Sequence, residues 1–560
     1  MSFFTRVHNL AGVKLLALLL ATSLFAASIA ANAETKPPIA KTEKIALVDG
    51  TVINPADGKT LPHAVVMLEG DRIAAVGSPN EAKVPADARR IDCTGKFILP
   101  GYIDSHVHFF QSGDLFTRPD VVDLTSIRPY AEEVAWTKSH LNDTFARYLR
   151  SGITSVVDVG GPIWNFTVRE QANSTAKAPR VAVAGPLISS VARPQLDLGD
   201  PPIVKVDTPE QGREMVRRLA AHRPDYIKIW YIVGPDHPVE KFRPIVHAVV
   251  AESHAHHLRV AVHATELEAA RAAVEEGADL LVHSVIDKPV DPAFIRLLRE
   301  HGTILTPTLV VFERYGRTFA NKLNLTPEEL AWGNPEVIAT LDVAKLPPDK
   351  TPDRIKTARA HSDEVLKRIR QTYDIAFKNL KTLEDAGIPI AAGTDAGNIG
   401  TIHGPALFRE FQLMHEAGLT PMQILKSTTA TAARVFDTAD GRSFRDAGTP
   451  KLGAIAVGNF ADLVILNSNP LDDISHASDI DTVIKGGTVY PAANFFPKAE
   501  STSAATLPEM MTGMVAHSYG GPEVLKLERI PVPEPDEHQI LVRTIASGVN
   551  PADPLILEGK

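Results

Sequence analysis

Two histidines, His106 and His108, are separated by one residue and have the side-chain chemistry to bind a metal ion. They follow the apolar run 96–99, which is closed by Pro100 and Gly101, so we predict a buried strand that is entered through a tight turn. Side chains at positions i and i+2 of a strand project from the same face. Both imidazoles would therefore point at one position, as a metal ion requires. Among 20 histidines such a pair arises readily by chance, so the hypothesis depends on further ligands downstream.

Four further polar residues interrupt or end separate apolar runs, namely Lys228, His263, His283 and Asp395. In a barrel of parallel strands, catalytic residues lie at the carboxyl ends of several different strands. A lysine inside a buried strand is costly unless it is paired or modified, so a salt-bridged core lysine is the alternative explanation for Lys228. One such residue alone would indicate a structural role. Four of them after the His-x-His pair predict a metal centre instead.

Strands and helices alternate through the middle of the chain, and these elements must position the polar residues. Beside the strand that carries His106, apolar β-type runs occupy seven ranges: 153–159, 181–184, 226–230, 260–263, 280–283, 303–306 and 388–392. Helical patterns such as 266–277 and 292–301 lie between most of them. Eight strands with helical crossovers predict an α/β fold, a (β/α)8 TIM-type barrel. A doubly wound open sheet is the alternative, which the lack of a Gly-x-Gly-x-x-Gly motif after any strand disfavours.

Strand-rich segments flank this middle region on both sides. Short strands alternate with turns from 45 to 91, and a similar pattern returns at 462–466 and 480–489. We therefore predict a small β-sandwich domain that is built from both flanks of the barrel. The predicted boundaries are 42–98 for the first part of the β-sandwich, 99–448 for the barrel and 449–495 for the second part of the β-sandwich.

The N-terminal segment has the composition of a secretory signal peptide. Arg6 and Lys14 precede the apolar run 15–30, and a short stretch of small residues ends at Ala33. The apolar run is short for a membrane span, which disfavours an uncleaved anchor. We predict that residues 1–33 are removed, that the protein is exported to the periplasm or secreted, and that no stable membrane span remains.

Composition narrows the function classes. The chain has 560 residues, too many for one ordinary core, and its 22% charged and 44% hydrophobic residues are typical of soluble globular proteins. A net charge of −9 without basic runs argues against a nucleic-acid partner. Cys93 is the only cysteine, so the chain forms no internal disulfide, and any zinc must be held by nitrogen and oxygen ligands. The sequence leaves a homo-oligomer open.

The motifs that carry these residues resemble those of the amidohydrolase superfamily, and within it the imidazolonepropionase-like and prolidase-like enzymes. The matching stretches are 100–108, 227–229, 263–264, 282–284 and 393–397. The resemblance extends from about residue 45 to about residue 490 and includes the split β-sandwich around the barrel.

The resemblance implies a binuclear metal centre. Its bridging ligand would be Lys228, carbamylated by CO2, and zinc is the expected divalent metal. One ion would be held by His106, His108 and Asp395, and the other by His263 and His283. Two such ions share a hydroxide that is available at neutral pH, and one of them polarises the substrate carbonyl. Asp395 is placed to take the proton on attack and to return it to the leaving nitrogen.

We therefore predict a metal-dependent amidohydrolase that cleaves the carbon–nitrogen bond of a small-molecule amide. Hydrolysis of Xaa-Pro dipeptides or of N-acyl amino acids at the same site is the alternative. A metal-free binding protein on the same barrel would be expected to have lost ligands, whereas all six ligand positions are filled in this sequence.

Two residues are candidates for substrate contacts. Tyr231 follows the strand that carries Lys228, and the prolidase-like resemblance implies that it contacts a substrate carboxylate; packing at the barrel rim is the alternative. His403 is the second candidate for a side chain that faces the site. The segment 311–363 is too long for a plain loop, which favours a helical lid.

The C-terminal tail follows a different pattern. Residues 496–513 form a predicted linker, and 514–560 resemble the opening of a quinone oxidoreductase of the medium-chain dehydrogenase family. The sequence ends before a nucleotide-binding unit with a Gly-rich loop, so we predict a truncated GroES-like remnant without oxidoreductase activity. A fragment of this size buries too little apolar surface to be stable alone.

Overall fold

The computed structural model of the protein describes four stretches of the chain: 43–436, 450–495, 510–518 and 524–532. The predicted signal peptide at 1–33, most of the predicted linker and the end of the predicted remnant lie outside the described residues. Within the described part of the chain, every helix is too short or too polar to cross a membrane.

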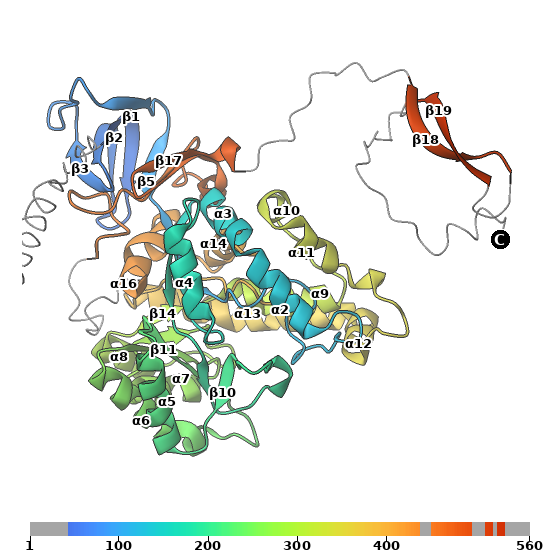
Figure 1. Ribbon diagram of the computed structural model, residues 1–560. Helices are drawn as coiled ribbons and strands as arrows, with labels where there is room; N and C mark the ends of the chain where they lie inside the picture. Colours follow the sequence, from blue (N-terminus) through green and yellow to red (C-terminus); the bar gives the residue numbers. More distant parts are fainter. Residues whose placement is uncertain (1–42, 437–449, 496–509, 519–523, 533–560) are drawn as a thin grey trace, which may run out of the picture. The chain divides into compact units, whose positions relative to one another are not determined.

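Parallel strands in the middle of the chain form a barrel, which confirms the predicted fold class, and helices surround the central strands (Figure 1). Seven positions are regular strands: β6 (Tyr102–Val107), β7 (Ile153–Asp158), β8 (Arg180–Val183), β11 (Tyr226–Trp230), β12 (Arg259–His263), β13 (Leu280–Val282) and β14 (Ile304–Thr306). A hydrogen bond of 2.8 Å from the Asp225 amide to the Val183 carbonyl joins β8 to β11. The eighth position is a segment that bridges β14 at Ile390 and β6 at Ala396, which closes the barrel.

Alternation along the strands explains why the polar residues lie inside the barrel. A buried layer takes a side chain from each of the eight positions: Ile103, Val157, Ala182, Tyr226, Ala261, Leu280, Ile304 and Ala391. Side chains two residues further along a strand point the same way. Lys228 therefore follows Tyr226 into the barrel, and His263 follows Ala261.

The third barrel strand is interrupted, which the sequence pattern did not predict. Gly185 adopts a φ of +74° and is followed by Pro186, so the strand breaks after β8. It resumes as β9 (Leu187–Ser189), which pairs with β11, and β10 (Ile203–Lys205) adds to its other edge.

Helices follow the strands around the barrel. They are α2 (Tyr130–Ser139), α3 (Leu141–Arg150), α4 (Asn165–Ser174), α5 (Pro209–Ala220), α6 (Val239–Ala255), α7 (Leu267–Glu275), α8 (Pro292–His301), α14 (Ala406–Glu416), α15 (Pro421–Lys426) and α16 (Ala432–Phe436). Local signals set their ends. Thr208 and Gln211 form a capping box at the start of α5. Asp291 caps α8, which ends at Gly302 in the left-handed conformation.

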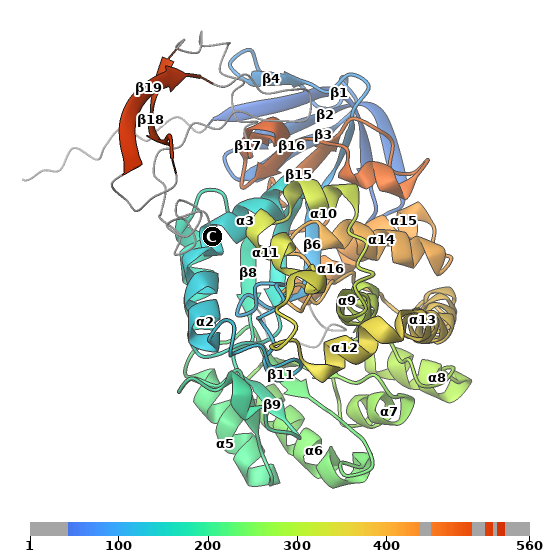
Figure 2. The same ribbon diagram turned by 90° about the vertical axis from the view of Figure 1, so that its right-hand side faces the viewer.

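The long segment after β14 is helical, as the sequence predicts for 311–363. It contains α9 (Leu309–Phe319), α10 (Pro327–Trp332), α11 (Pro335–Thr340) and α12 (Asp353–Ala360), followed by α13 (Ser362–Asp385). Figure 2 shows α12 beside α9 and α13. Apolar residues of these helices and of the loop after β6 form one buried cluster that includes Leu115, Val122, Phe319, Val337 and Ile355. The helical segment is thereby packed on the loop that follows the first pair of predicted ligands.

Both flanks of the barrel contribute to one eight-stranded sheet (Figures 1 and 2). Its strands are β1 (Lys44–Asn54), β2 (Lys59–Glu69), β3 (Arg72–Gly77), β4 (Arg89–Asp92), β5 (Phe97–Pro100), β15 (Leu463–Leu466), β16 (Ile480–Lys485) and β17 (Thr488–Pro491). β15 pairs antiparallel with β5 and so joins the two flanks. Gly101 then links β5 to β6, and a Cβ atom there would lie 2.3 Å from Thr154, so this turn requires glycine.

The chain divides into two compact units, Met1–Phe495 and Phe496–Lys560. In the second unit, β18 (Met510–Ala516) and β19 (Leu525–Pro531) form an antiparallel hairpin. β18 thus begins inside the range assigned to the linker. An isolated two-stranded hairpin is only marginally stable in water.

Candidate metal centre

The first three predicted ligands converge where β6 meets the eighth barrel position. Nε2 of His106 lies 3.3 Å from Nε2 of His108, and Asp395 Oδ1 lies 3.3 Å and 3.2 Å from these two atoms. Asp395 Oδ1 is buried and has no partner with hydrogen-bond geometry within the described residues. Two nitrogen lone pairs and a carboxylate oxygen that face one point, without bonding one another well, fit a shared cation.

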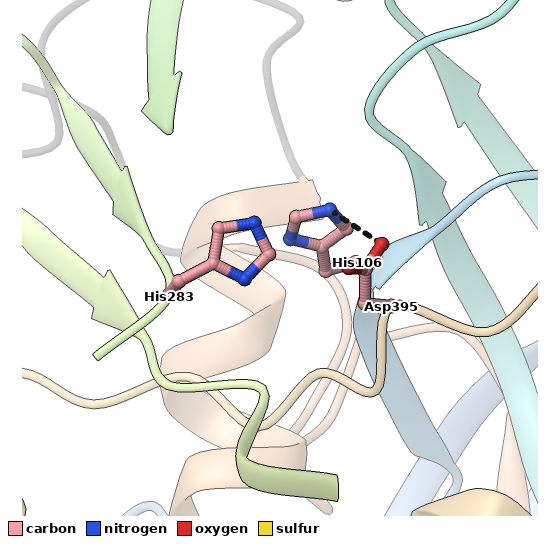
Figure 3. Close-up of side chains that lie close together, drawn as sticks. All are labelled: His106, His283 and Asp395. Carbon is pink, nitrogen blue, oxygen red and sulfur yellow. Dashed lines mark ion pairs between the residues drawn. The ribbon is translucent and has the colours of Figure 1, made fainter. Parts of the chain in front are cut away.

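His283 and His263 complete the cluster from β13 and β12. Figure 3 shows His283 facing His106 and Asp395, and the three residues offer ligand atoms that all lie within 4.8 Å of one another. The rings of His263 and His283 are 4.4 Å apart between centroids. Burial lowers the pKa of the His106 and His263 imidazoles to about 3, so both rings are neutral, the form that binds metal.

Backbone conformation brings two of these side chains inward. Leu280 and Val282 both point into the barrel core, so strict alternation would turn His283 away from it. His283 adopts a φ of 78° and Asp395 a φ of 60°, both in the left-handed region. This conformation is uncommon outside glycine and tends to persist at functional sites.

Lys228 lies in β11 and is only 1% exposed. It forms no ion pair with any carboxylate in the described part of the chain, so a salt-bridged core lysine is not observed. Burial lowers the pKa of its amine to about 7. A buried lysine without an ion-pair partner is costly, and modification to an anion is one way to remove that cost beside metal ions.

Outer hydrogen bonds orient two of the histidines. His108 Nδ1 donates to the Gly160 carbonyl at 2.7 Å, which leaves Nε2 free to accept a metal. His283 Nδ1 is hydrogen-bonded to the Thr308 hydroxyl at 2.6 Å. Thr308 precedes α9 but its hydroxyl does not cap that helix.

A carboxylate from α14 replaces the missing cap of α9. Glu410 accepts the backbone N–H groups of Leu309 and Val310 at 2.9 Å and 2.7 Å. This arrangement satisfies the first turn of α9 and leaves the Thr308 hydroxyl to the metal-ligand candidate His283.

Asp104 fixes the eighth position against the first strand. Its Oδ2 accepts the Thr394 hydroxyl at 2.7 Å and its Oδ1 accepts the Thr394 amide at 3.0 Å. The Asp395 amide also donates to the His106 carbonyl at 2.7 Å. These bonds set the distance between Asp395 and the His-x-His pair.

Five of the six candidates line one cavity of about 490 Å³, namely His108, Lys228, His263, His283 and Asp395. His106 lies beneath them at 1% exposure. A volume of this size suits a small-molecule ligand. A hollow of about 570 Å³ beside α6 and α7 contains none of the predicted ligands.

The structure does not bring the two predicted substrate-contact residues to this cavity. The Tyr231 side chain is buried, and its hydroxyl donates to the Val239 carbonyl at 2.6 Å. His403 is also buried. Its ring nitrogens are occupied by the Tyr148 hydroxyl at 2.7 Å and the Gln111 carbonyl at 2.8 Å.

The cavity is also lined by residues that the sequence analysis did not identify. They are chiefly Phe110, Gln111, Arg118, Asp120, Arg193, Trp230, Phe312, Tyr315 and Arg354. Most belong to loops and helices that follow the barrel strands and carry no motif. Trp230 is different, because alternation from Lys228 places it on the same side of β11 as the lysine.

Comparisons with known proteins agree with this geometry. The amidohydrolase family matches residues 97–490. Ochratoxinase of Aspergillus niger is 26% identical over 512 residues, covering 84% of this chain and 93% of that protein. A prolidase solved in complex with N-methylphosphonate-L-proline superposes with a TM-score of 0.58 at 25% identity, covering 80% of this chain and 99% of that one.

A separate short match concerns a different family. A quinone oxidoreductase of Lama guanicoe is 46% identical over 56 residues, which cover 10% of this chain and 17% of that protein. The predicted resemblance of the C-terminal segment to a quinone oxidoreductase is thus confirmed, and it extends over a short part of the chain. The amidohydrolase match, in contrast, covers well over half of the chain and includes the barrel, all six candidate ligands and the second part of the sheet. On this evidence the chain belongs to the amidohydrolase family.

Proposed function

We propose that the protein is a binuclear metal-dependent amidohydrolase that hydrolyses a carbon–nitrogen bond of a small molecule. The observation that carries the proposal is the convergence of nitrogen and oxygen ligands on one end of the barrel, with a buried unpaired lysine lining the same cavity. Family membership and the ochratoxinase and prolidase relatives support hydrolysis of an amide-type bond.

The ligand set favours zinc. His106, His108 and Asp395 would hold one ion, and His263 and His283 would hold the other. Imidazole and carboxylate groups are usual zinc ligands, and no thiol is present among these residues. The neutral Lys228 amine would add to CO2 with loss of one proton, and the resulting anionic carbamate would bridge the two ions.

The bound metals would supply a hydroxide nucleophile at neutral pH and polarise the substrate carbonyl. Asp395 accepts the proton of the attacking oxygen and delivers it to the nitrogen of the leaving group. The Asp395 amide donates to the His106 carbonyl at 2.7 Å, which holds Asp395 beside the His-x-His pair. The outer hydrogen bonds to Gly160 and Thr308 hold the imidazoles in place during this transfer.

Replacement of Lys228 by alanine tests the proposal. We expect Lys228→Ala to lose bound metal and hydrolytic activity on a panel of N-acyl amino acids, dipeptides and cyclic amides, and propionate to restore part of both. Lys367→Ala, at a lysine of α13 outside the cavity, is the matched control. A fully metal-loaded and active Lys228→Ala protein would contradict the bridging role.

Export is a second part of the proposal. It rests on the charged, apolar and small-residue pattern of residues 1–33. N-terminal sequencing of protein from the producing cells should find Glu34 as the first residue, and an intact Met1 or Ser2 terminus would contradict cleavage.

A further inference from the structure

Asn398 lies in the loop after the eighth barrel position, three residues beyond Asp395, and lines the cavity at 4% exposure. Its side-chain amide is engaged at both ends. Nδ2 donates to the Asp395 carbonyl at 3.1 Å, while Oδ1 accepts Arg118 Nη1 at 2.7 Å and the Tyr315 hydroxyl. A guanidinium group only donates hydrogen bonds, so the amide oxygen must face Arg118 and the amide nitrogen must face Asp395.

The bond from Asn398 reaches a backbone in an uncommon conformation. Asp395 adopts a φ of 60°, in the left-handed region, which persists outside glycine where the surroundings hold it. The Asp395 amide donates to the His106 carbonyl at 2.7 Å, and the Asp395 carbonyl accepts from Asn398. Both backbone groups of Asp395 are therefore held, and Asn398 holds the one that the His-x-His strand does not.

Two side chains from other elements fix Asn398 in turn. Arg118 lies in the loop after β6, and its Nε and Nη2 donate to the two oxygens of Asp120 at 2.7 Å each. The Asp120 side chain is 1% exposed, so this bidentate pair is a buried unit. Tyr315 lies on α9, and Arg118 Nη1 is 3.1 Å from its hydroxyl oxygen. Asn398 thereby connects the eighth barrel position to the loop after β6 and to the first helix of the segment after β14.

A local turn is the simpler explanation for the Asn398 side chain, because asparagine often bonds to nearby backbone groups. Such a turn needs only the bond from Nδ2 to the Asp395 carbonyl. It does not require Oδ1 to accept from a guanidinium group that lies 280 residues away in the sequence. A hydrogen bond to a charged group is stronger than a neutral one and polarises the amide, so Nδ2 becomes a better donor. The contacts of Oδ1 therefore strengthen the bond to Asp395.

We infer that Asn398 is a positioning residue for Asp395, and that Arg118 and Tyr315 hold Asn398 in the orientation that this role requires. Asn398 acts through Asp395, because both ends of its amide are engaged within the protein. The inference deepens the proposed function and rests on it for the metal ion that Asp395 would bind. It also gives the Tyr315 hydroxyl a role, since this group links α9 to the metal centre.

Zinc affinity tests the inference on the full-length protein without a substrate. Asn398→Leu keeps the approximate volume of the side chain and removes its hydrogen bonds. Competition with a chelator should show zinc binding that is weaker by about 10-fold or more, the loss typical of residues that orient a metal ligand. Asn459→Leu, beside β3, is the matched control and should keep wild-type affinity. The Asn459 side chain is also buried and donates to a backbone carbonyl, that of Ala454, at 3.0 Å.

Tyr315→Phe leaves Asn398 in place and so tests the inference even where Asn398→Leu does not fold. Loss of the hydroxyl should lower zinc affinity by less than Asn398→Leu does. The double variant Asn398→Leu/Tyr315→Phe should lose no more than Asn398→Leu alone, since Tyr315 acts through Asn398. Tyr490→Phe removes a hydroxyl that donates to the Ala176 carbonyl at 2.7 Å and should match the wild-type protein. Unchanged zinc affinity in either single variant, or losses that multiply in the double variant, would overturn the inference.

Activity separates this inference from the proposed function. At saturating zinc, the kcat of Asn398→Leu on a cleaved member of the amide panel should fall with KM unchanged, because Asn398 acts through Asp395 and not on the substrate. A rise in KM with unchanged kcat would overturn the positioning role. Zinc binding that depends on Asn398, without hydrolysis of any panel member, would refute the proposed function and leave the positioning role standing. A wild-type protein that binds no zinc would contradict both.

Discussion

The cavity has two kinds of wall, and they differ in how the chain builds them. The metal-ligand candidates stand on the barrel strands or just beyond them, and the rings of His108 and His283 are held by the Gly160 carbonyl and the Thr308 hydroxyl. Another part of the lining, which includes Arg118, Arg193 and Arg354, stands on loops and on α12, and Asp120 lies beside the guanidinium groups of Arg118 and Arg193. We therefore expect the barrel strands to fix the chemistry and the connecting segments to choose the substrate, as in other TIM barrels.

The largest effect is expected at the metal side. Asp395→Asn removes the proposed metal ligand and the proposed proton carrier together, so kcat should fall by about 10³-fold or more. The fold should persist, since Asp104 and Thr394 still hold the segment in place. Steady-state kinetics and thermal melting measure the two effects, with Asp374→Asn on the exposed face of α13 as control. Near-normal turnover would mean that the proton takes another route.

A smaller effect is expected from a residue that orients one of the metal-ligand candidates. Thr308→Val keeps the volume of the side chain but removes the hydrogen bond to His283, so metal affinity should fall about 10- to 100-fold. Competition with a chelator measures this affinity. Thr318→Val is a matched control on α9, because the buried Thr318 hydroxyl has no hydrogen-bond partner within the described residues. Equal loss in both variants would show that His283 does not depend on Thr308.

The substrate side should respond through kcat/KM and not through metal content. Gln111 lines the cavity at 3% exposure, and its Oε1 has no hydrogen-bond partner in the described chain. A buried amide oxygen without a partner is costly, and a substrate donor would satisfy it. Gln111→Leu should lower kcat/KM about 10-fold with full metal occupancy. Loss of metal in this variant would show that Gln111 supports the metal centre and does not act on the substrate alone.

No effect is expected from the tail. The described barrel and sheet cores are complete within residues up to Phe495, and β18 and β19 form only a two-stranded hairpin. A protein that ends at Ala499 should match the full chain in melting temperature, metal content and kcat/KM. A drop of several degrees, or lost activity, would assign the tail a stabilising role.

The positions of several metal-ligand candidates were predictable from the sequence, because side chains alternate between the two faces of a strand. Lys228 and His263 lie two residues beyond core residues on their strands, so alternation alone places them in the barrel. The same rule places Trp230 inside and Tyr231 outside, which agrees with the buried Tyr231 hydroxyl bound to Val239. The prediction of a substrate contact at Tyr231 came from the family resemblance, and the structure does not place this residue at the cavity.

Other residues of the cavity are not placed by the alternation of side chains along a strand. His283 reaches the cluster through a left-handed φ of 78°, which alternation does not anticipate. Arg193 and Arg354 lie about 160 residues apart in sequence, and they line the same cavity because their guanidinium groups lie beside the neighbouring residues Asp120 and Val121. Side-chain direction in such loops depends on tertiary contacts, so a single sequence does not encode it in a readable pattern.

The central claim is that Lys228 carries a carbamate in a two-metal centre. Carbon-13 NMR of the protein prepared with zinc and ¹³C-bicarbonate, together with metal analysis of the same sample, tests it most directly. We predict one carbamate resonance and two zinc ions per chain, and loss of both from Lys228→Met. A wild-type protein that holds zinc without any carbamate signal, or a Lys228→Met protein that keeps both ions, would contradict the claim.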